Sequence, residues 1–545
     1  MLEGLVQNDY QLTLQQNLER MRRVVGTAEV VTLVAPGEKT RASYAEVAER
    51  VDRLAAGLAS LGVEPGDRVG TLCWNHQTHL EAYLAIPCMG AVLHTLNLRL
   101  FPEQLEYIVN HARDKVILVD DSLVPLLEPL ADRLESVERY VVIGDGDCGE
   151  LSPSMTYDEL LDAGGEFSYP ELDERQAAGL CYTSGTTGNP KGVLYSHRSS
   201  LLHALAQSAG AAFGITPQDR ILPVVPMFHA NAWGLAYAGT LSGADLIMPN
   251  RFLQAEPLAG LIESERVTVA GAVPTIWMDL LRYADEHRPD FSSLRIVPCG
   301  GAAVPRALMQ GFEERHGVHI VQAWGMTEMS PLGSIAHPPQ GAEGEEAWRY
   351  RTTAGQLSIL VDFRLMNGEE EVSWDGESTG EVEVRGPWVA SAYYEDPTGD
   401  EKFHDGWLRT GDIGAITPDG YLRLTDRSKD VIKSGGEWIS SVELENELMG
   451  HPGVTEAAVI AMPDERWSER PLACVVAGAN APSAEDLREY LGARVAKWWV
   501  PDAFEFIDEV PKTSTGKFDK KVLRSRLADG DLEVVRTEKA AAAGG

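Results

Sequence analysis

The stretch YTSGTTGNPKG at residues 182–192 is the most informative segment of the chain, because its composition suits a phosphate-binding loop. Glycines let the backbone approach an anion closely, and hydroxyl and amide N–H groups can donate hydrogen bonds to its oxygens. The stretch does not fit the Walker pattern, since Gly185 and Lys191 have the wrong spacing and Gly192 follows the lysine. A Ser/Thr/Gly run read alone is more often a flexible turn, so the surrounding segments decide its assignment.

Those surroundings predict a layered α/β protein. Over the first two thirds of the chain, short apolar runs such as residues 115–119 alternate with amphipathic helical patterns such as residues 44–61. This alternation is typical of α/β layers with largely parallel sheets. Residues 380–386 alternate with period two, which predicts a half-exposed strand in a β-subdomain. A chain of 545 residues with 44% hydrophobic content should form at least two domains.

Charge and composition limit the partners. The net charge of −35 argues against nucleic acid or anionic lipid as a general partner, because both require clustered Lys and Arg. We find neither a secretion signal nor a run of about 18 apolar residues, so we expect no integral membrane association. The six cysteines lack metal-ligand spacing and are interpreted as reduced core thiols of a cytoplasmic protein.

The whole segment 182–198 resembles the signature of the adenylate-forming superfamily, which comprises acyl-CoA synthetases, luciferases and peptide-synthetase adenylation domains. The resemblance covers nearly the whole chain, and its motifs look closest to those of medium- and long-chain fatty acyl-CoA synthetases. The further motifs, all in the family's order, are QAWGMTE at 322–328, TGD at 410–412, DRSKD at 426–430, KSGGEWIS at 433–440 and PKTSTGK at 511–517.

The resemblance implies a fold in two parts. Residues 1–425 would form a large N-terminal domain of layered α/β subdomains plus a β-subdomain, and residues 426–528 a small, mobile C-terminal α/β lid. The hinge would lie at Asp426, and residues 529–545 are expected to form a disordered tail. A homodimer is expected from the resemblance alone.

The resemblance also implies a reaction. An ATP-dependent ligase would activate a medium- or long-chain fatty acid as its acyl-adenylate, release pyrophosphate, and transfer the acyl group to coenzyme A with release of AMP. Because two anions must meet, charge neutralisation and alignment carry most of the rate. By resemblance, Lys517 would bridge the carboxylate and the α-phosphate, Glu328 and Thr183 would bind Mg²⁺, and His229 would complete the catalytic set.

The nucleotide site is inferred in the same way. Thr183, Ser184, Thr186 and Lys191 would hold the β- and γ-phosphates, while Asp412 and Arg427 would hold the ribose hydroxyls. Trp324 departs from the family's usual tyrosine but keeps an aromatic ring that can stack on adenine. The full set of nucleotide-binding candidates is Thr183, Ser184, Gly185, Thr186, Thr187, Gly188, Lys191, Gly301, Ala302, Gln322, Ala323, Trp324, Gly325, Met326, Thr327, Asp412, Arg427 and Lys429.

Two further groups of residues concern the acid and the thiol. The acyl pocket candidates are His229, Trp233, Gly301 and Trp324. His229 stands where amino-acid-activating domains present an aspartate, which disfavours an amino acid substrate. The candidates for the coenzyme A tunnel and the gate are Lys433, Gly435, Gly436 and Trp438. Trp438 resembles the tryptophan that gates the acyl tunnel in long-chain fatty acyl-CoA synthetases, although it could equally be a packing aromatic.

Several alternatives stay open. Each buried methylene is worth about 0.8 kcal/mol, so one side chain changes length preference several-fold and a short or thioether acid such as methylthio-propionate is a competitor. An amide-forming ligase or a luciferase-like oxygenase would also form an acyl-adenylate. A non-enzymatic sensor would be expected to have lost Lys517 or Glu328, and both are present.

Overall fold

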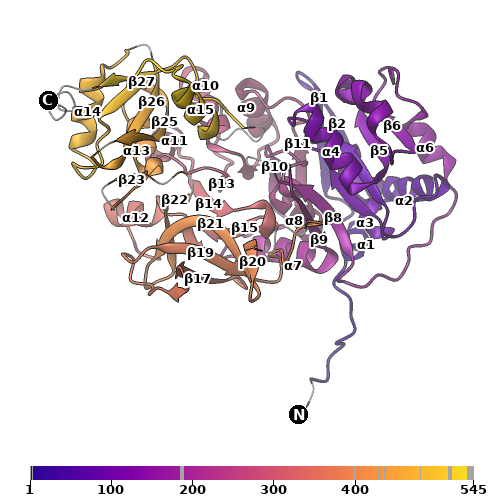
Figure 1. Ribbon diagram of the computed structural model, residues 1–545. Coiled ribbons are helices and arrows are strands. Elements are labelled where there is room, and N and C mark those ends of the chain that lie inside the picture. Colours follow the sequence, from indigo (N-terminus) through magenta and orange to yellow (C-terminus); the bar gives the residue numbers. More distant parts are fainter. Residues whose placement is uncertain are drawn as a thin grey trace.

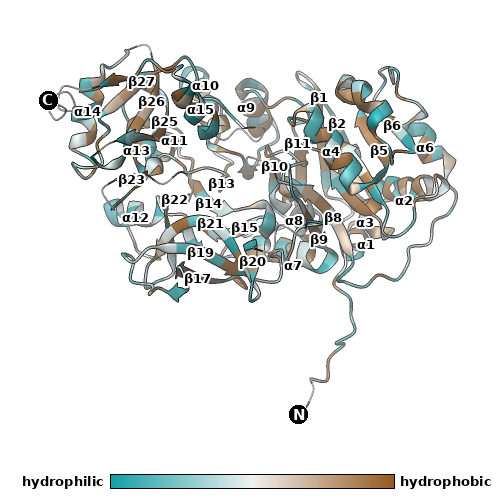
Figure 2. Cartoon of the chain, in the orientation of Figure 1, coloured by the Kyte–Doolittle hydropathy of each residue, from teal (hydrophilic) through white to brown (hydrophobic). Residues whose placement is uncertain are grey.

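The computed structural model describes residues 2, 4–183, 189–396, 401–427, 430, 432–434, 437–464, 466–478, 480–513 and 518–536, with only the backbone at 426, 427, 437 and 438. Figure 1 shows layered sheets and helices in the N-terminal part and a smaller sheet with its own helices at the C-terminal end. Strands such as β5 are hydrophobic along most of their length (Figure 2). The expected mixed α/β architecture is therefore present.

A seven-stranded sheet in the order β7-β6-β5-β3-β4-β8-β9 carries the phosphate-loop segment. All neighbouring strands are parallel except β8 and β9. The strands are β3 (Arg68–Leu72), β4 (Val92–Thr95), β5 (Asp114–Asp120), β6 (Arg139–Ile143), β7 (Ser154–Thr156), β8 (Ala177–Tyr182) and β9 (Gly192–Ser196). The helices of this region are α1 (Gln15–Arg23), α2 (Tyr44–Ser60), α3 (Gln77–Cys88), α4 (Pro102–Ala112), α5 (Val124–Leu127) and α6 (Tyr157–Ala163).

A five-stranded sheet in the order β12-β10-β11-β1-β2 lies beside it. Only the β1–β2 pair is antiparallel, and it places β2 at the edge. The strands are β1 (Glu29–Ala35), β2 (Glu38–Ser43), β10 (Arg220–Pro223), β11 (Asp245–Met248) and β12 (Val269–Gly271). The accompanying helices are α7 (His197–Ser208), α8 (Leu235–Ser242), α9 (Ala255–Ser264), α10 (Pro274–His287) and α11 (Arg306–His316).

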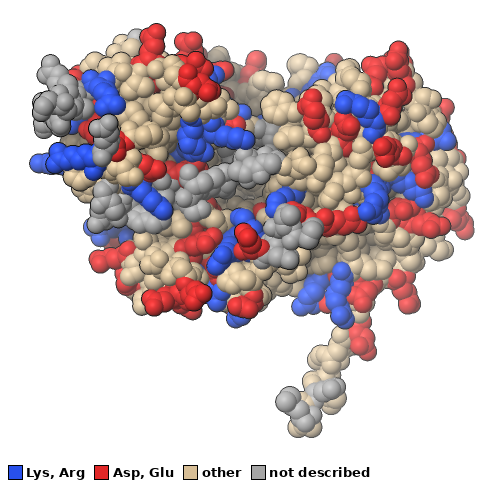
Figure 3. Space-filling view, viewed as in Figure 1, with Lys and Arg blue, Asp and Glu red and all other residues tan. Residues whose placement is uncertain are grey.

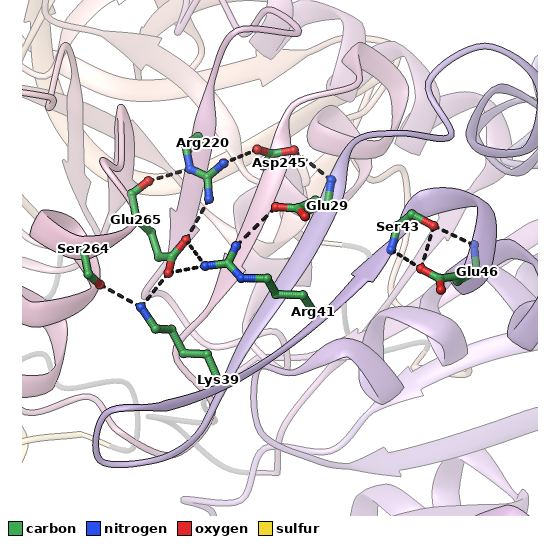
Figure 4. A network of polar contacts seen from close by, with 9 residues as sticks. All are labelled: Glu29, Lys39, Arg41, Ser43, Glu46, Arg220, Asp245, Ser264 and Glu265. Carbon is green, nitrogen blue, oxygen red and sulfur yellow. Dashed lines mark hydrogen bonds and ion pairs between the residues drawn. The ribbon is translucent and has the colours of Figure 1, made fainter.

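An ionic network fastens the edge hairpin to this sheet (Figure 4). The Glu265 side chain is only 3% exposed and accepts hydrogen bonds from Lys39 Nζ at 2.5 Å, Arg41 Nη2 at 2.6 Å and Arg220 Nη2 at 2.8 Å. Burial alone would raise the pKa of Glu265, but the hydrogen bonds from Arg41 and Lys39 outweigh it and lower the pKa. The network thus joins both strand β2 and strand β10 to one buried carboxylate.

A ten-stranded sheet connects the α/β layers to the β-subdomain. Its order is β13-β14-β15-β16-β22-β21-β19-β17-β18, with β20 paired to β21. The strands are β13 (Val297–Gly300), β14 (Ile320–Gly325), β15 (Leu332–Ile335), β16 (Gly355–Leu357), β17 (Asp362–Asn367), β18 (Glu370–Glu371), β19 (Gly380–Arg385), β20 (Phe403–His404), β21 (Trp407–Ile416) and β22 (Tyr421–Arg427), and helix α12 covers Gly344–Arg351. Strand β19 lies at the strand predicted at residues 380–386, but it is more buried than the predicted half-exposed strand, because ion pairs with Arg364 and His404 enclose the Glu383 carboxylate.

The C-terminal part has its own sheet and its own core. Its strands are β23 (Ile432–Ser434), β24 (Glu437–Ile439), β25 (Val454–Asp464), β26 (Ser468–Ala477), β27 (Ala503–Phe506) and β28 (Val535–Arg536), and its helices are α13 (Ser441–Met449), α14 (Ala484–Gly492) and α15 (Lys520–Asp529). Two hydrophobic clusters contain only residues from Ile432 onward, whereas the other clusters reach no further than Leu424. The boundary at residue 426 stays a prediction, and Leu424 and Ile432 of these separate clusters lie on either side of it.

The predicted disordered tail from residue 529 is wrong for its first part. Strand β28 pairs with β27, with Phe504 opposite Val535. Leu532 and Val534 pack against the C-terminal hydrophobic cluster that contains Ala458, Leu472 and Leu523. This apolar contact explains why the segment is ordered. Residues 537–545 lie outside the described residues. Among the residues that are described, no helix is long and apolar enough to cross a membrane.

Candidate active site

The two ends of the phosphate-loop segment are tied together. Thr183 follows β8 and Lys191 precedes β9, and the Thr183 N–H donates to the Lys191 carbonyl at 2.9 Å. The Lys191 N–H donates to Thr183 Oγ1 at 3.1 Å. The antiparallel β8–β9 pair thus holds both predicted phosphate ligands at the mouth of one loop. The loop candidates Ser184, Gly185, Thr186, Thr187 and Gly188 lie outside the described residues.

A tyrosine connects Lys191 to Glu328. The Tyr393 hydroxyl donates to Glu328 Oε1 at 2.6 Å, and Lys191 Nζ lies 4.9 Å from the centroid of the Tyr393 ring. Burial, with the negative charge of Glu328, raises the pKa of Tyr393, so the hydroxyl remains a donor. Lys191 Nζ also pairs with Asp396 Oδ2 at 3.1 Å. The structure therefore brings together two candidates that are far apart in sequence.

Sequence reasoning missed Tyr393 and Asp396. Neither belongs to a motif that was singled out, and their only signal is an aromatic pair followed by acidic residues at 393–396. Their role emerges from a contact between distant segments, since the Tyr394 N–H donates to the Gly192 carbonyl at 2.8 Å and holds this segment beside β9.

Glu328 is held rigidly and supplies oxygen. Its side chain is buried, and its carbonyl accepts from the Ala390 N–H at 2.7 Å. The Tyr195 hydroxyl on β9 donates to the carbonyl of Thr327 at 2.7 Å, which ties this segment to the phosphate-loop hairpin. Mg²⁺ prefers carboxylate, hydroxyl and phosphate oxygens. The carboxylate of Glu328 and the hydroxyl of Thr183 are therefore suitable donors for that ion.

The ribose candidates also converge. Asp412 and Arg427 face each other in the β21–β22 register, although the side chain of Arg427 lies outside the described part of the chain. Trp324 Nε1 donates to Asp412 Oδ2 at 2.9 Å. A Cβ on Gly333 would lie 2.6 Å from the Trp324 ring, so the indole packs directly on that glycine. The indole N–H thereby orients the carboxylate expected to bind the ribose.

The segments expected around adenine lie on neighbouring strands. In the parallel β13–β14 pair, Gly300 faces Ala323, so Gly301 and Ala302 follow one strand beside Trp324 on the next. Gly301 has φ +84°, a conformation that favours glycine. These residues therefore sit at the carboxyl edge of two parallel strands, where open α/β sheets bind ligands.

Three other nucleotide-binding candidates make hydrogen bonds or close contacts within the protein. The Gln322 side chain accepts from the Val304 N–H at 2.6 Å and donates to the Thr353 carbonyl at 2.6 Å, so its amide is engaged within the protein. Gly325 cannot carry a side chain, because a Cβ would lie 1.8 Å from the Pro331 carbonyl oxygen. The Met326 N–H donates to that same carbonyl at 3.1 Å.

The acyl candidates lie near the same edge. His229 is half-buried and precedes the short segment η3 (Ala230–Gly234), which contains Trp233. Trp233 is 8% exposed, and a Cβ on Gly271 or on Gly300 would lie 3.7 or 3.8 Å from its ring. The indole thus lies across the ends of strands β12 and β13, next to Gly301.

The lid candidates are described only in part. Lys517, Lys429, Gly435 and Gly436 lie outside the described residues, as do the side chains of Asp426 and Trp438. Lys433 is exposed and faces Trp438 in the β23–β24 register. Phe518 follows Lys517 in sequence and lines a cavity of about 30 Å³ together with Ala302, Ala303 and Met449. The lid therefore contacts the N-terminal domain beside a nucleotide candidate.

The electrostatics of the face in Figure 3 are uneven. Red acidic side chains are scattered over it among tan residues, whereas blue Lys and Arg side chains gather beside the hollow between the C-terminal part and the N-terminal layers. Charges farther away than about 8–10 Å are largely screened at physiological salt. Local cations can therefore receive a polyanion despite the net charge of −35.

Comparisons with known proteins agree with this geometry. The "3-methylmercaptopropionyl-CoA ligase" of Ruegeria lacuscaerulensis is 42% identical, over 95% of this chain and 98% of the relative. The "Long-chain-fatty-acid--CoA ligase" of Thermus thermophilus is 46% identical, over 95% and 96%. The crystal structure of the anthranilate CoA ligase AuaEII in complex with anthranoyl-AMP superposes with a TM-score of 0.87 at 27% identity, covering 96% of this chain and 99% of that one.

The family assignment rests on two matched regions. Residues 20–394 match the family described as AMP-binding enzyme, and residues 443–517 match the AMP-binding enzyme C-terminal domain. The first region contains the phosphate-loop hairpin, Glu328 and Trp324. The predicted resemblance to the adenylate-forming superfamily is confirmed, and this chain belongs to the AMP-binding enzyme family.

Proposed function

We propose that the protein is an ATP-dependent CoA ligase for medium- or long-chain fatty acids that works through an acyl-adenylate. A carboxylate oxygen attacks the α-phosphorus of ATP, and the bond to pyrophosphate breaks. The thiolate of coenzyme A then attacks the acyl carbonyl carbon, and AMP leaves with the former carboxylate oxygen. Both steps need anions held in alignment, which the site's cations and N–H donors can supply.

Each side chain has a proposed role. Thr183 and Lys191, together with Ser184 and Thr186, hold the β- and γ-phosphates. ATP would displace Asp396 from Lys191, because the nucleotide carries more negative charge than one carboxylate. Lys517 bridges the carboxylate and α-phosphate oxygens during adenylation.

Magnesium is proposed to bind Glu328 and Thr183. The ion would supply charge neutralisation of the phosphates, and the hydrogen bond from Tyr393 would keep the Glu328 carboxylate oriented. Asp412, oriented by Trp324, holds the ribose together with Arg427. Lys433, Gly435, Gly436 and Trp438 remain the candidates for the thiol tunnel.

One observation carries the proposal: the linked set Lys191–Tyr393–Glu328 at the phosphate-loop hairpin. The Tyr393 side chain contacts both the Lys191 ammonium group and the buried Glu328 carboxylate. A site for a metal ion and a triphosphate needs such a cation and such a carboxylate close together. The Trp324–Asp412 pair adds a polar partner for the ribose.

The experiment is a panel of carboxylic acids from three to eighteen carbons, with methylthio-propionate and aryl acids, assayed for pyrophosphate and AMP with and without coenzyme A. We expect thioester from a fatty acid, and we expect Lys517→Ala to lose adenylation while it still converts a supplied acyl-adenylate. If no acid releases pyrophosphate, the proposal is wrong. If coenzyme A never accelerates AMP release, an amine or oxygen acceptor replaces it.

A second candidate is a CoA ligase for a short thioether acid. It is favoured by the 42% identity to a protein named 3-methylmercaptopropionyl-CoA ligase. Trp233 at the ends of β12 and β13 could form the floor of a short pocket rather than one wall of a long one. The acid that gives the highest kcat/KM in the same panel decides between the two.

We also propose a cytoplasmic location and a homodimeric assembly. The six cysteines are unpaired and five of them are buried, which supports the predicted cytoplasmic location. A homodimer remains a prediction, and light scattering after size-exclusion chromatography measures it.

A further inference from the structure

Segment η3 (Ala230–Gly234) has an unusual backbone. Its φ angles are +42°, +54°, +52°, +55° and +78°, so four successive residues with side chains lie in the left-handed region. A left-handed helical conformation costs about 1–2 kcal/mol per L-residue, and asparagine is one of the few types that tolerates it. Such a conformation persists only where the surrounding structure imposes it.

The surroundings impose it through a buried polar clamp, which we define as Asn231, Cys181 and Gln207. The Cys181 thiol donates to Asn231 Oδ1 at 3.2 Å, and the Gln207 amide donates to the Trp233 carbonyl. Burial raises the pKa of Cys181 to about 11, so the thiol keeps its proton for this bond. All three clamp residues are at most 6% exposed.

Packing closes the turn from a second side. A Cβ on Gly234 would lie 2.6 Å from His203 Nδ1, so neither its positive φ nor its close approach suits another residue. The Tyr83 hydroxyl donates to the Met227 carbonyl just before the turn and lies 3.4 Å from Asn231 Oδ1. Buried side chains therefore contact the turn on two sides and leave its backbone a single conformation.

The clamp joins two functional segments. Cys181 lies on β8, two residues before Thr183, and it faces Thr95 in the parallel β4–β8 register. At the other end of the clamp, Trp233 lies across the tips of β12 and β13. A shift of the turn would therefore move the Trp233 ring while the phosphate-loop hairpin, held by its own strand pair, stays in place.

We propose that Asn231 is a positioning residue that sets acyl-chain selectivity by holding Trp233 in the left-handed turn. The inference rests on the proposed ligase function and names unbranched aliphatic acids as the substrates that the Trp233 wall discriminates by length. Without the hydrogen bond from Cys181 to Asn231, the turn adopts other conformations. The Trp233 indole then no longer sets a single depth for the acyl pocket. Selectivity between acids then falls while binding of ATP is preserved.

The test compares acid profiles of variants. Asn231→Gly removes the acceptor without adding strain, since glycine adopts positive φ freely. Cys181→Ala removes the donor, and Cys181→Ser retains one. Asn250→Gly is the matched control, because Asn250 also has a positive φ of +55° but is not part of the clamp.

We expect Asn231→Gly to lower kcat/KM for the best acid by about 10-fold or more, since small misplacements can cost up to about 100-fold. The ratio of kcat/KM between acids that differ by four carbons should move toward one, with the KM for ATP within about twofold of wild type. Cys181→Ala should share this profile, add little to Asn231→Gly in the double variant, and be rescued by Cys181→Ser. Asn250→Gly should keep the wild-type profile.

Two results would overturn the inference. An Asn231→Gly enzyme with the wild-type acid profile would show that the turn needs no clamp. Equal losses for every acid and for ATP, together with a lowered melting temperature, would show a merely structural role. A wild-type enzyme that activates no acid would refute the proposed function and this inference with it, whereas an active wild type isolates failure of the inference.

Discussion

Replacing Trp324 by phenylalanine tests the ribose site without removing its aromatic ring. The change deletes the indole N–H that donates to Asp412 Oδ2 at 2.9 Å. A hydrogen bond to a charged group is worth about 1.5–3 kcal/mol, which corresponds to a factor of about 10–150 in an equilibrium constant. Because Trp324 is half-buried, we expect the lower end, about a 10-fold rise in the KM for ATP.

The sharper assay uses nucleotide analogues. In the wild type, 2′-deoxy-ATP or 3′-deoxy-ATP should lose affinity because a ribose hydroxyl no longer reaches Asp412. In Trp324→Phe the same analogues should lose less affinity. The Trp324 N–H and the ribose hydroxyl both act through the Asp412 carboxylate, so the effects of removing them are not additive. Phenylalanine keeps a π-face for adenine, so kcat should change less than KM.

The matched control is Trp374→Phe, at a tryptophan that is 37% exposed and lies in the connection between β18 and β19. It should leave the KM for ATP and the analogue penalties unchanged. A wild-type KM for ATP in Trp324→Phe, or the same loss of affinity for the deoxy analogues in both enzymes, would show that the indole N–H does not orient Asp412 for the ribose.

Three further changes probe separate parts of the molecule. Glu265→Gln removes the charge that three cations share, so urea unfolding should show a loss of about 3 kcal/mol in the free energy of unfolding. This is the lower end of the range for a broken buried pair, because the three partners are partly exposed; a loss equal to that of the exposed Glu256→Gln would contradict this. Tyr393→Phe leaves Glu328 without its 2.6 Å donor and should raise the magnesium concentration for half-maximal activity several-fold, and an unchanged magnesium titration would argue against that role. Burial lowers the pKa of His203 to about 3, below the unfolded value of about 6.5, so at pH values between the two the unfolded chain binds one more proton and stability falls as the pH drops. Between pH 7 and pH 5, the free energy of unfolding of wild type should fall by about 2 kcal/mol more than that of His203→Gln. An equal fall in both proteins would exclude the effect.

Much of the fold could be predicted because local patterns determined it. The helix predicted at 44–61 is α2 (Tyr44–Ser60), which begins with a capping box of Ser43 and Glu46, and the apolar run at 115–119 lies within β5. The ordered strand at 535–536 was not predictable, because two residues carry no period and their pairing with β27 depends on tertiary contacts.

The site divides in the same way. Motifs identified Thr183, Lys191, Glu328 and Asp412, since each belongs to a string that resembles the family. Tyr393 and the left-handed turn at 230–234 escaped prediction because their significance lies in contacts between distant segments. Periodicity and turn propensity describe neighbours in sequence, whereas these features depend on neighbours in space.

The central claim is that the acid passes through an acyl-adenylate, and isotope transfer measures it most directly. The fatty acid, labelled with ¹⁸O in both carboxylate oxygens, is turned over with ATP and coenzyme A, and the AMP is weighed by mass spectrometry. We predict one ¹⁸O in each AMP, because the carboxylate oxygen that attacks the α-phosphorus leaves with it when the thiol attacks the carbonyl. Unlabelled AMP accompanied by thioester would exclude an acyl-adenylate intermediate.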